Sequence, residues 1–176
     1  MPRYQSWQAL QFRGNRKNQK EQKMVAGGKT NGQLLKRVAE IYEWLDSQIH
    51  DNSDLAGQCD ACGKCCDFAQ FDHHLFITTP ELMYLAANLA GENIKPMTTS
   101  QCPYNVGGQC TIYEYRFAGC RIFCCKGNAD FQSRLSESAL KKLKLLSVRS
   151  PQDCTEFQIP YHYTDLASAL NGFVAV

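Results

Sequence analysis

A dense run of cysteines is the feature that most constrains this chain, because four thiols fall within eight residues and six more lie downstream. The run has the spacing C-x2-C-x2-C-C and consists of Cys59, Cys62, Cys65 and Cys66. Gaps of two residues let a tight turn direct successive thiolates at one centre, and backbone N–H groups in the turn can hydrogen-bond to sulfur. Three thiols in this register, with others downstream, predict a bound metal or iron–sulfur cluster.

Chain length, hydropathy and the N-terminal segment indicate the cellular compartment of the protein. The 176 residues are enough for one domain, and no apolar run approaches the roughly 20 residues that cross a bilayer. The N-terminus is polar and basic, without the apolar middle of a secretory signal. We therefore expect a cytoplasmic protein with no membrane partner, whose reduced thiols are metal ligands or redox centres. The alternative is a disulfide framework in an exported or unusually oxidising setting.

Charge is distributed unevenly along the chain. Residues 1–37 carry nine Lys/Arg and one acid, a net charge of +8, and residues 38–176 carry ten Lys/Arg and sixteen acids, a net charge of −6. We expect a flexible basic leader at 1–29, followed by a cysteine-cluster metal-binding domain at 30–176. If the leader became helical, its cations would share one face, which suits nucleic acid or an acidic protein partner. The alternatives are a solvated tail, or residues upstream of a true start at Met24.

The periodicity of apolar residues predicts a small, mainly helical α+β domain. Thr30 and Gln33 resemble a capping box, and Asp130 is placed to cap a second long helix. Gly107 and Gly108 predict a short hairpin in which Cys110 faces Asn105. The cysteine-rich loops show no periodicity of apolar residues, and we expect a bound metal to hold them together. The predicted elements are helix 33–49, a polar turn at 51–57, strand 74–77, a helix from Thr79 towards Gly91, hairpin strands 102–106 and 109–113, helix 131–147 and helix 164–170. The helix from Thr79 has Thr79 as its predicted cap, Pro80 in its first turn and Glu81 near its positive end.

Eight cysteines are the candidate ligands for the metal or cluster. Adjacent side chains diverge, so within the pairs Cys65-Cys66 and Cys124-Cys125 we expect one thiol to serve another centre or to be spare. His73 and His74 would point to opposite faces of a strand, and at most one of them would reach the metal. Cys154 is interpreted as a buried or free thiol. The candidates are Cys59, Cys62, Cys65, Cys66, Cys102, Cys110, Cys120 and Cys124.

The spacing favours a 4Fe–4S cluster over zinc, although both accept four thiolates. A closed zinc site usually takes two pairs of ligands from two turns, whereas three clustered cysteines and a distant Cys-Pro suit a cubane. The predicted ligand set is Cys59, Cys62 and Cys65 with Cys102 or Cys120. The remaining candidates would complete this centre or hold a second one. Four thiolates leave a net negative charge on either centre, which nearby cations would compensate. The cations of the cysteine segments are Lys64, Arg116 and Arg121, although all three could be ordinary surface charges.

The ordered motifs of residues 59–125 resemble the YkgJ-like cysteine-cluster family, the CxxCxxCC zinc- or iron-chelating domain. The resemblance is carried by the Cys59–Cys66 run, Cys102-Pro103, Cys110-Thr-Ile-Tyr-Glu-Tyr-Arg116 and Cys120-Arg-Ile-Phe123. Where the family usually has Arg-Pro, this chain has Arg116-Phe117. The resemblance implies metal or iron–sulfur binding at the shared cysteines. The cluster also resembles that of flagellin lysine N-methylases, but this chain has no glycine-rich nucleotide loop.

Three functions are open at this point. The chain could be a cysteine-cluster metal-binding protein, an electron-transfer or redox subunit, or a protein-modifying enzyme related to the lysine N-methylases. The sequence contains no C-x3-C-x2-C run, G-x-S-x-G elbow, P-loop or H-E-x-x-H motif. We therefore favour the metal-binding protein and predict no catalytic residue.

Overall fold

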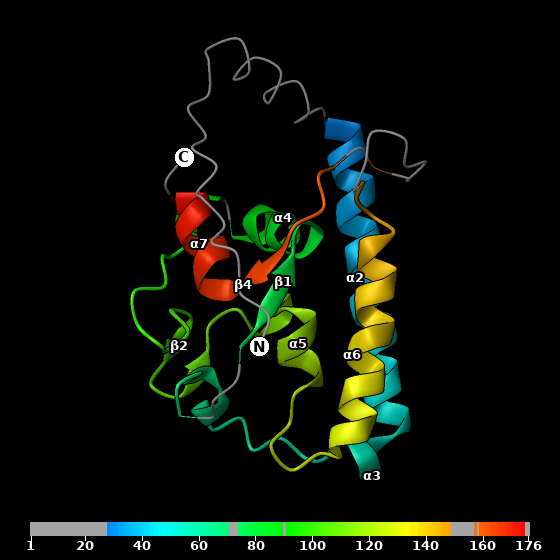
Figure 1. Cartoon of the computed structure of the whole chain (residues 1–176), viewed down its shortest axis with the longest axis vertical. Helices are drawn as coiled ribbons and strands as arrows, with labels where there is room; N and C mark the ends of the chain where they lie inside the picture. Colours follow the sequence, from blue (N-terminus) through cyan, green and yellow to red (C-terminus); the bar gives the residue numbers. More distant parts are fainter. Residues whose placement is uncertain (1–27, 71–73, 90, 149–156, 158, 175–176) are drawn as a thin grey trace, which may run out of the picture.

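Two long helices, α2 (Gly28–Asp51) and α6 (Ala129–Lys144), pack side by side along one edge of the protein (Figure 1). Their apolar faces bury a first core together with the short helix α5 (Ala118–Ile122). The computed structural model describes residues 28–70, 74–89, 91–148, 157 and 159–174. The remaining residues, including 1–27 of the predicted leader, lie outside this description. The buried members of the first core include Leu34, Val38, Leu45, Ile122, Leu135, Ala139 and Leu143.

The periodicity predicted both long helices correctly, but not the way they begin. Helix α2 starts at Gly28, so Thr30 lies inside the helix and the predicted capping box is wrong. Helix α6 is capped by Asn128, whose Oδ1 accepts a hydrogen bond of 2.9 Å from the Phe131 backbone N–H. The predicted cap, Asp130, lies in the first turn, where its charge suits the positive end of the helix dipole. The predicted turn at 51–57 contains a short helix, α3 (Ser53–Ala56).

A two-stranded antiparallel sheet joins distant parts of the chain. Strand β1 (Phe76–Thr78) pairs with β4 (Tyr163–Asp165), with Ile77 opposite Thr164. The predicted strand at 74–77 is therefore confirmed, with a small shift. The predicted helix at 164–170 is partly wrong, because its first residues belong to β4. Helix α7 (Leu166–Val174) begins after them and continues past Gly172.

Helix α4 (Thr79–Asn88) follows β1 without a loop, and residues of α4 and α7 both belong to a second apolar core. Its cap is Thr78 rather than Thr79, and Glu81 at the third helical position accepts a hydrogen bond of 2.8 Å from the Thr78 N–H. A turn of 3-10 helix, η2 (Gly91–Asn93), continues the chain. The second core includes Ile77, Leu85, Ile94, Met97, Tyr104, Ile112, Phe117 and Leu170.

The predicted hairpin is confirmed. Strands β2 (Asn105–Val106) and β3 (Gln109–Cys110) are antiparallel, and Asn105 lies opposite Cys110 as the two-residue turn requires. Gly107 and Gly108 both have positive φ, at 60° and 84°, which is the conformation of a type I′ turn.

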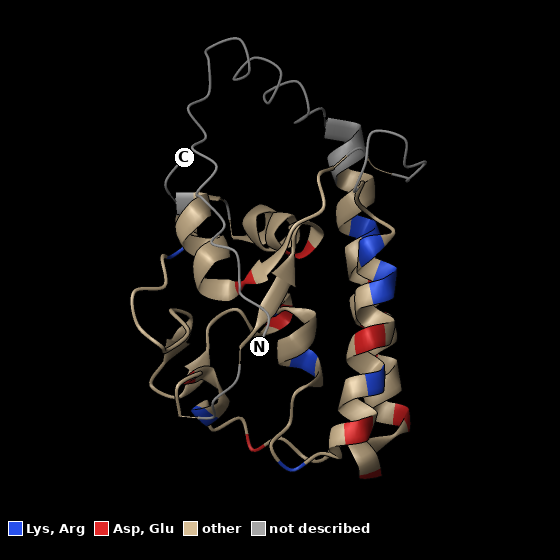
Figure 2. Cartoon of the chain, viewed as in Figure 1, with Lys and Arg blue, Asp and Glu red and all other residues tan. Residues whose placement is uncertain are grey.

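The described elements make a mainly helical α+β fold, as predicted. Lys and Arg are concentrated along α2 and α6, where acidic residues lie among them (Figure 2). Among the described helices, none is both long and apolar enough to span a lipid bilayer.

Candidate metal centre

Three cysteine-bearing segments surround one cavity of about 590 Å³. They are the first loop (residues 57–66), the hairpin segment (residues 102–110) and the third segment (residues 120–127). Nine cysteines fall within the described residues, and all nine are free thiols that line this cavity. The structure therefore brings the eight predicted ligands together and adds Cys125. Cys154 and His73 lie outside the described residues, whereas His74 is exposed and lines the cavity.

The first loop is fixed to the hairpin segment at its C-terminal end. The Cys102 N–H donates a hydrogen bond of 2.8 Å to the Cys66 carbonyl, and the Asn105 amide donates one of 2.9 Å to the Gly63 carbonyl. Gly63 has a φ of 69°, and a Cβ there would overlap the carbonyl oxygen of Gly108. Only glycine fits this contact without displacing the backbone. The two cysteines of η1 (Lys64–Cys66), a turn of 3-10 helix, are thereby held beside Cys102.

Replacing Gly63 by alanine should measure how strongly this contact fixes the loop. Gly107→Ala is the matched control, because Gly107 also has positive φ but has no atom within 4 Å of its would-be Cβ. Both changes introduce left-handed strain, and Gly63→Ala adds the overlap, so we expect it to destabilise the fold by about 1–3 kcal/mol more. Urea unfolding of the two variants gives the difference. Equal unfolding free energies would mean that the loop is not held here.

The third segment is fixed to the N-terminal end of the first loop. The Asn128 N–H donates a hydrogen bond of 2.7 Å to the Leu55 carbonyl, and the Lys126 Nζ lies 2.7 Å from a carboxylate oxygen of Asp60. A Cβ on Gly57 would lie 2.7 Å from the backbone nitrogen of Gly127, so the two backbones touch. The first loop is therefore held at its two ends by two different segments.

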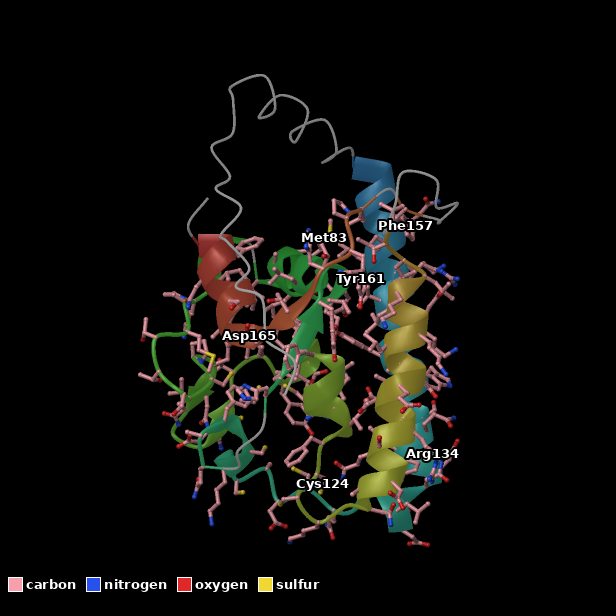
Figure 3. All side chains as sticks on the ribbon, in the orientation of Figure 1. Met83, Cys124, Arg134, Phe157, Tyr161 and Asp165 are labelled. Atoms are coloured by element: carbon pink, nitrogen blue, oxygen red, sulfur yellow. The ribbon has the colours of Figure 1, made fainter. Side chains whose placement is uncertain are left out.

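Gln132 of α6 fixes the third segment from the other side. Its Nε2 donates a hydrogen bond of 2.8 Å to the Cys124 carbonyl, and its Oε1 accepts one of 3.4 Å from the Cys124 N–H. The Gly127 N–H also donates to the Cys124 carbonyl, at 2.9 Å, which closes a tight turn. Figure 3 shows Cys124 on this turn, near the base of α6. Cys124 is buried and Cys125 is exposed.

Five of the thiols form a group, which we call the inner thiols, around η1, the hairpin segment and α5. Each of these thiols affects the pKa of at least one other thiol in the group. Such an effect acts over a short distance, so the five side chains lie near one another. The remaining four, which we call the outer thiols, lie on the first loop and the third segment. The inner thiols are Cys65, Cys66, Cys102, Cys110 and Cys120, and the outer thiols are Cys59, Cys62, Cys124 and Cys125.

Cys65 and Cys66 show that neighbouring thiols need not diverge. A hydrogen bond between the two side chains lowers the pKa of Cys65 to about 6, with a smaller contribution from the Arg116 charge, and raises the pKa of Cys66. At neutral pH the pair is therefore a thiolate that accepts a hydrogen bond from a thiol. The 3-10 turn keeps the Cys65 and Cys66 side chains close to each other, and whether Cys66 serves the same centre stays a prediction.

Burial raises the pKa values of two other inner thiols, Cys102 and Cys120. The Cys120 side chain is exposed at the cavity, where the surrounding protein still disfavours the charged form of its thiol. Neighbouring thiols add to the effect, because a second thiolate is unfavourable beside a first. Without a cation, Cys66, Cys102 and Cys120 therefore resist becoming thiolates together.

Arg116 is the cation best placed to compensate such charge. Its guanidinium stacks on the Tyr113 ring at 3.7 Å, and Arg116 lines the cavity. Its positive charge lowers the pKa values of Cys65 and Cys120. The Arg116 Nε is buried and, within the described part of the chain, has no hydrogen-bond partner, so it is available to a sulfur or anion in the cavity.

The other two predicted cations have different surroundings. Lys64 lines the cavity, as predicted. Arg121 instead holds α5 against α2, with its Nη1 2.7 Å from an Asp46 carboxylate oxygen and its guanidinium 4.4 Å from the Tyr42 ring centre. Its Nε and Nη2 donate hydrogen bonds to the Arg116 and Glu114 carbonyls, so Arg121 positions the segment that carries Arg116.

Zinc and iron–sulfur clusters place different demands on the arrangement of their thiolate ligands. Among the described residues, no three His, Cys, Asp or Glu side chains converge closely enough to hold a single ion. A tetrahedral zinc site with bonds of about 2.3 Å requires four sulfurs within about 3.8 Å of one another. In a cubane each thiolate binds a separate iron, so the sulfurs surround a volume instead of a point. Nine free thiols line one cavity of about 590 Å³, and such a cavity has room for a group larger than a single ion.

Cys125 is the thiol that sequence reasoning set aside. Its adjacency to Cys124 was taken as a reason to exclude it, although both residues line the same cavity. The signal that could have identified it is the repeated Cys-Cys pair, since the chain has the same pattern at Cys65-Cys66.

Comparison of this chain with protein-family models, curated proteins and solved structures finds no match. Membership of the YkgJ-like family therefore stays a prediction.

Proposed function

We propose that this chain is a metal-binding protein whose cysteine thiolates hold an iron–sulfur cluster, with 4Fe–4S favoured and zinc as the alternative. The observation that carries the proposal is the single cavity lined by nine free thiols from three chain segments. Thiolates are the usual ligands of both metals. Thiols gathered for packing alone would not need a volume between them.

The inner thiols are the residues that we expect to hold this centre. Support comes from their mutual proximity, from the low pKa of Cys65, and from the Arg116 charge beside two of them. The ligand set predicted from sequence combined Cys65 with Cys59 and Cys62, and it stays a prediction. The hydrogen bond between Cys102 and Cys66 favours a set centred on η1 and the hairpin segment.

When bound, a 4Fe–4S cluster supplies a centre that exchanges one electron, and zinc supplies a structural link without redox chemistry. The chain's own contribution is to orient the sulfurs through the loop contacts and to hold a cation at Arg116.

Protein purified without oxygen should be brown, with broad visible absorption from thiolate-to-iron charge transfer, and should bleach on reduction. Iron, acid-labile sulfide and zinc are then measured on the same sample. A colourless protein with stoichiometric zinc and no iron would overturn the preference for iron but keep metal binding. A colourless, metal-free protein, even after anaerobic incubation with iron and sulfide or with zinc, would overturn the proposed function.

A further inference from the structure

We propose that Arg121 is a positioning residue of the metal centre, which holds the Arg116 guanidinium at the cavity where the inner thiols lie. The inference rests on the proposed metal-binding function and adds to it a residue that determines how tightly the metal is held. A guanidinium has hydrogen-bond donors and no acceptor, so Arg121 does not bind the metal itself. It acts through Arg116 and through the chain around that residue.

The buried guanidinium of Arg121 joins three parts of the fold. The side chain is 8% exposed, and its Nη1 lies 2.7 Å from an Asp46 carboxylate oxygen on α2. Its Nη2 donates a hydrogen bond of 2.7 Å to the Glu114 carbonyl, and its Nε donates one of 3.1 Å to the Arg116 carbonyl. The plane of the group also stacks on the Tyr42 ring of α2. A planar group with several directed contacts fixes the orientation of its neighbours as well as their distance.

The segment that Arg121 holds is short and carries the Arg116 cation. It consists of η3 (Tyr113–Tyr115), a single turn of 3-10 helix, followed by Arg116 in an extended conformation. One turn of 3-10 helix has little stability of its own, so its position depends on contacts with the rest of the fold. The Arg116 guanidinium stacks on the Tyr113 ring of the same turn. If the turn shifted, the ring and the cation would move together.

Arg116 is well placed to act on a metal bound by the inner thiols. It lines the cavity, and α5, which carries Cys120, begins two residues after it. Its charge is close enough to Cys65 and Cys120 to act on both. A centre ligated by thiolates carries a net negative charge, which a fixed cation stabilises. Metal affinity should therefore fall when Arg116 is no longer held in this position.

The variant Arg121→Lys separates the positioning role from the charge. Lysine keeps the positive charge that faces Asp46, but its ammonium cannot reproduce the planar contacts with two carbonyls at once. Zn²⁺ is the probe, and its affinity for the reduced, metal-free full chain is measured without oxygen by competition with a chromophoric chelator. We expect affinity to fall about 10–100-fold, as it does when a residue that supports metal ligands is lost. Arg134→Lys, the same change at an exposed position on α6, is the matched control and should leave the affinity unchanged.

A double-mutant cycle tests whether Arg121 acts through Arg116. The variant Arg116→Gln removes the cation and should itself weaken Zn²⁺ binding. In the Arg116→Gln background, Arg121→Lys should then cause little further loss of affinity. A residue that only stabilises the fold would give the same loss in both backgrounds, and that result would overturn the proposal. An Arg121→Lys affinity equal to that of the wild type would also overturn it.

A second variant keeps the test decisive if Arg121→Lys does not fold. Asp46 is 51% exposed, so Asp46→Ala removes one support of Arg121 without changing a buried side chain. It should weaken Zn²⁺ binding in the wild-type background and not in the Arg116→Gln background, and equal effects in the two backgrounds would overturn the proposal.

The proposed function and the role of Arg121 fail in different ways. Wild-type protein that takes up neither Zn²⁺ nor an iron–sulfur cluster would overturn both. Wild-type protein that binds metal while the cycle shows no coupling would overturn the role of Arg121 alone. If the wild type accepts a cluster but not Zn²⁺, the same cycle is measured on the reduction potential of the cluster. Displacing the Arg116 cation should lower that potential, because the added electron loses a favourable charge.

Discussion

Removing the metal of the proposed centre should lower the melting temperature of the protein by about 8–16 °C. A ligand present at a thousand times its dissociation constant stabilises the folded state by about 4 kcal/mol. For a chain of this length, each kcal/mol shifts the melting temperature by about 2–4 °C. Metal analysis must verify the removal by chelator, with reductant present to prevent disulfide formation. Reloading the metal should restore the melt, and an unchanged melt after verified removal would contradict a stabilising centre.

Metal removal should first destabilise the part of the fold around the cavity. The first core, between α2, α5 and α6, consists of apolar side chains and contains no cysteine among its buried members. The second core packs against Cys102 and Cys110, so it adjoins the cavity directly. In the metal-free protein, amide hydrogen exchange should therefore become faster in the cysteine segments and the hairpin, while the amides of α2 and α6 stay protected. Uniform loss of protection would mean that the helices also depend on the metal.

Sequence reasoning predicted the elements whose signals are local. The apolar period of α2 and α6 and the Gly107-Gly108 turn each depend on residues that are neighbours along the chain. The starts of the helices were less certain, because several polar residues near Thr30 and Asp130 could serve as caps. The residues of β4 were assigned to a helix, because a strand of three residues is too short to show an alternation of apolar and polar residues. Its partner β1 is also distant in the sequence, so the pairing leaves no local signal.

The grouping of the thiols was beyond sequence reasoning for the same reason. Spacing placed Cys59, Cys62 and Cys65 together because they are close in sequence. The structure fixes the two ends of that loop to different segments, through contacts such as Lys126 to Asp60, which are 66 residues apart. The predicted list of eight cysteines was nevertheless useful, since all of them line the one cavity.

Glu81 illustrates a residue whose local role was predicted and whose larger role was not. As an acid in the first turn it was expected at the start of α4, and its Oε2 accepts hydrogen bonds of 2.8 Å from both the N–H and the hydroxyl of Thr78. Its Oε1 also accepts a hydrogen bond of 2.9 Å from the Ala118 N–H, at the start of α5. The carboxylate is 3% exposed and joins the beginnings of two helices, one of which carries Cys120.

Replacing Glu81 by alanine should destabilise the protein by about 3 kcal/mol or more, because the buried N–H groups of Thr78 and Ala118 lose their acceptor. Glu137→Ala, at an exposed position on α6, is the matched control and should change the unfolding free energy by less than about 0.5 kcal/mol. Urea unfolding of the two variants measures both values. A loss for Glu81→Ala as small as the control's would mean that water replaces the carboxylate.

The pH dependence of stability, measured with a different variant, Glu81→Gln, provides a second check on Glu81. Burial raises the pKa of Glu81 above its ordinary value, although the hydrogen bonds from Ala118 and Thr78 oppose the shift. The folded protein therefore binds this proton at higher pH than the unfolded chain does. The stability that Glu81 contributes through protonation is fully present below the unfolded pKa, and is lost as pH rises through the raised folded value. The difference in unfolding free energy between wild type and Glu81→Gln, which does not titrate, should show this decline with increasing pH. A difference that is constant across that range would mean that Glu81 keeps its ordinary pKa and is solvated in the folded protein.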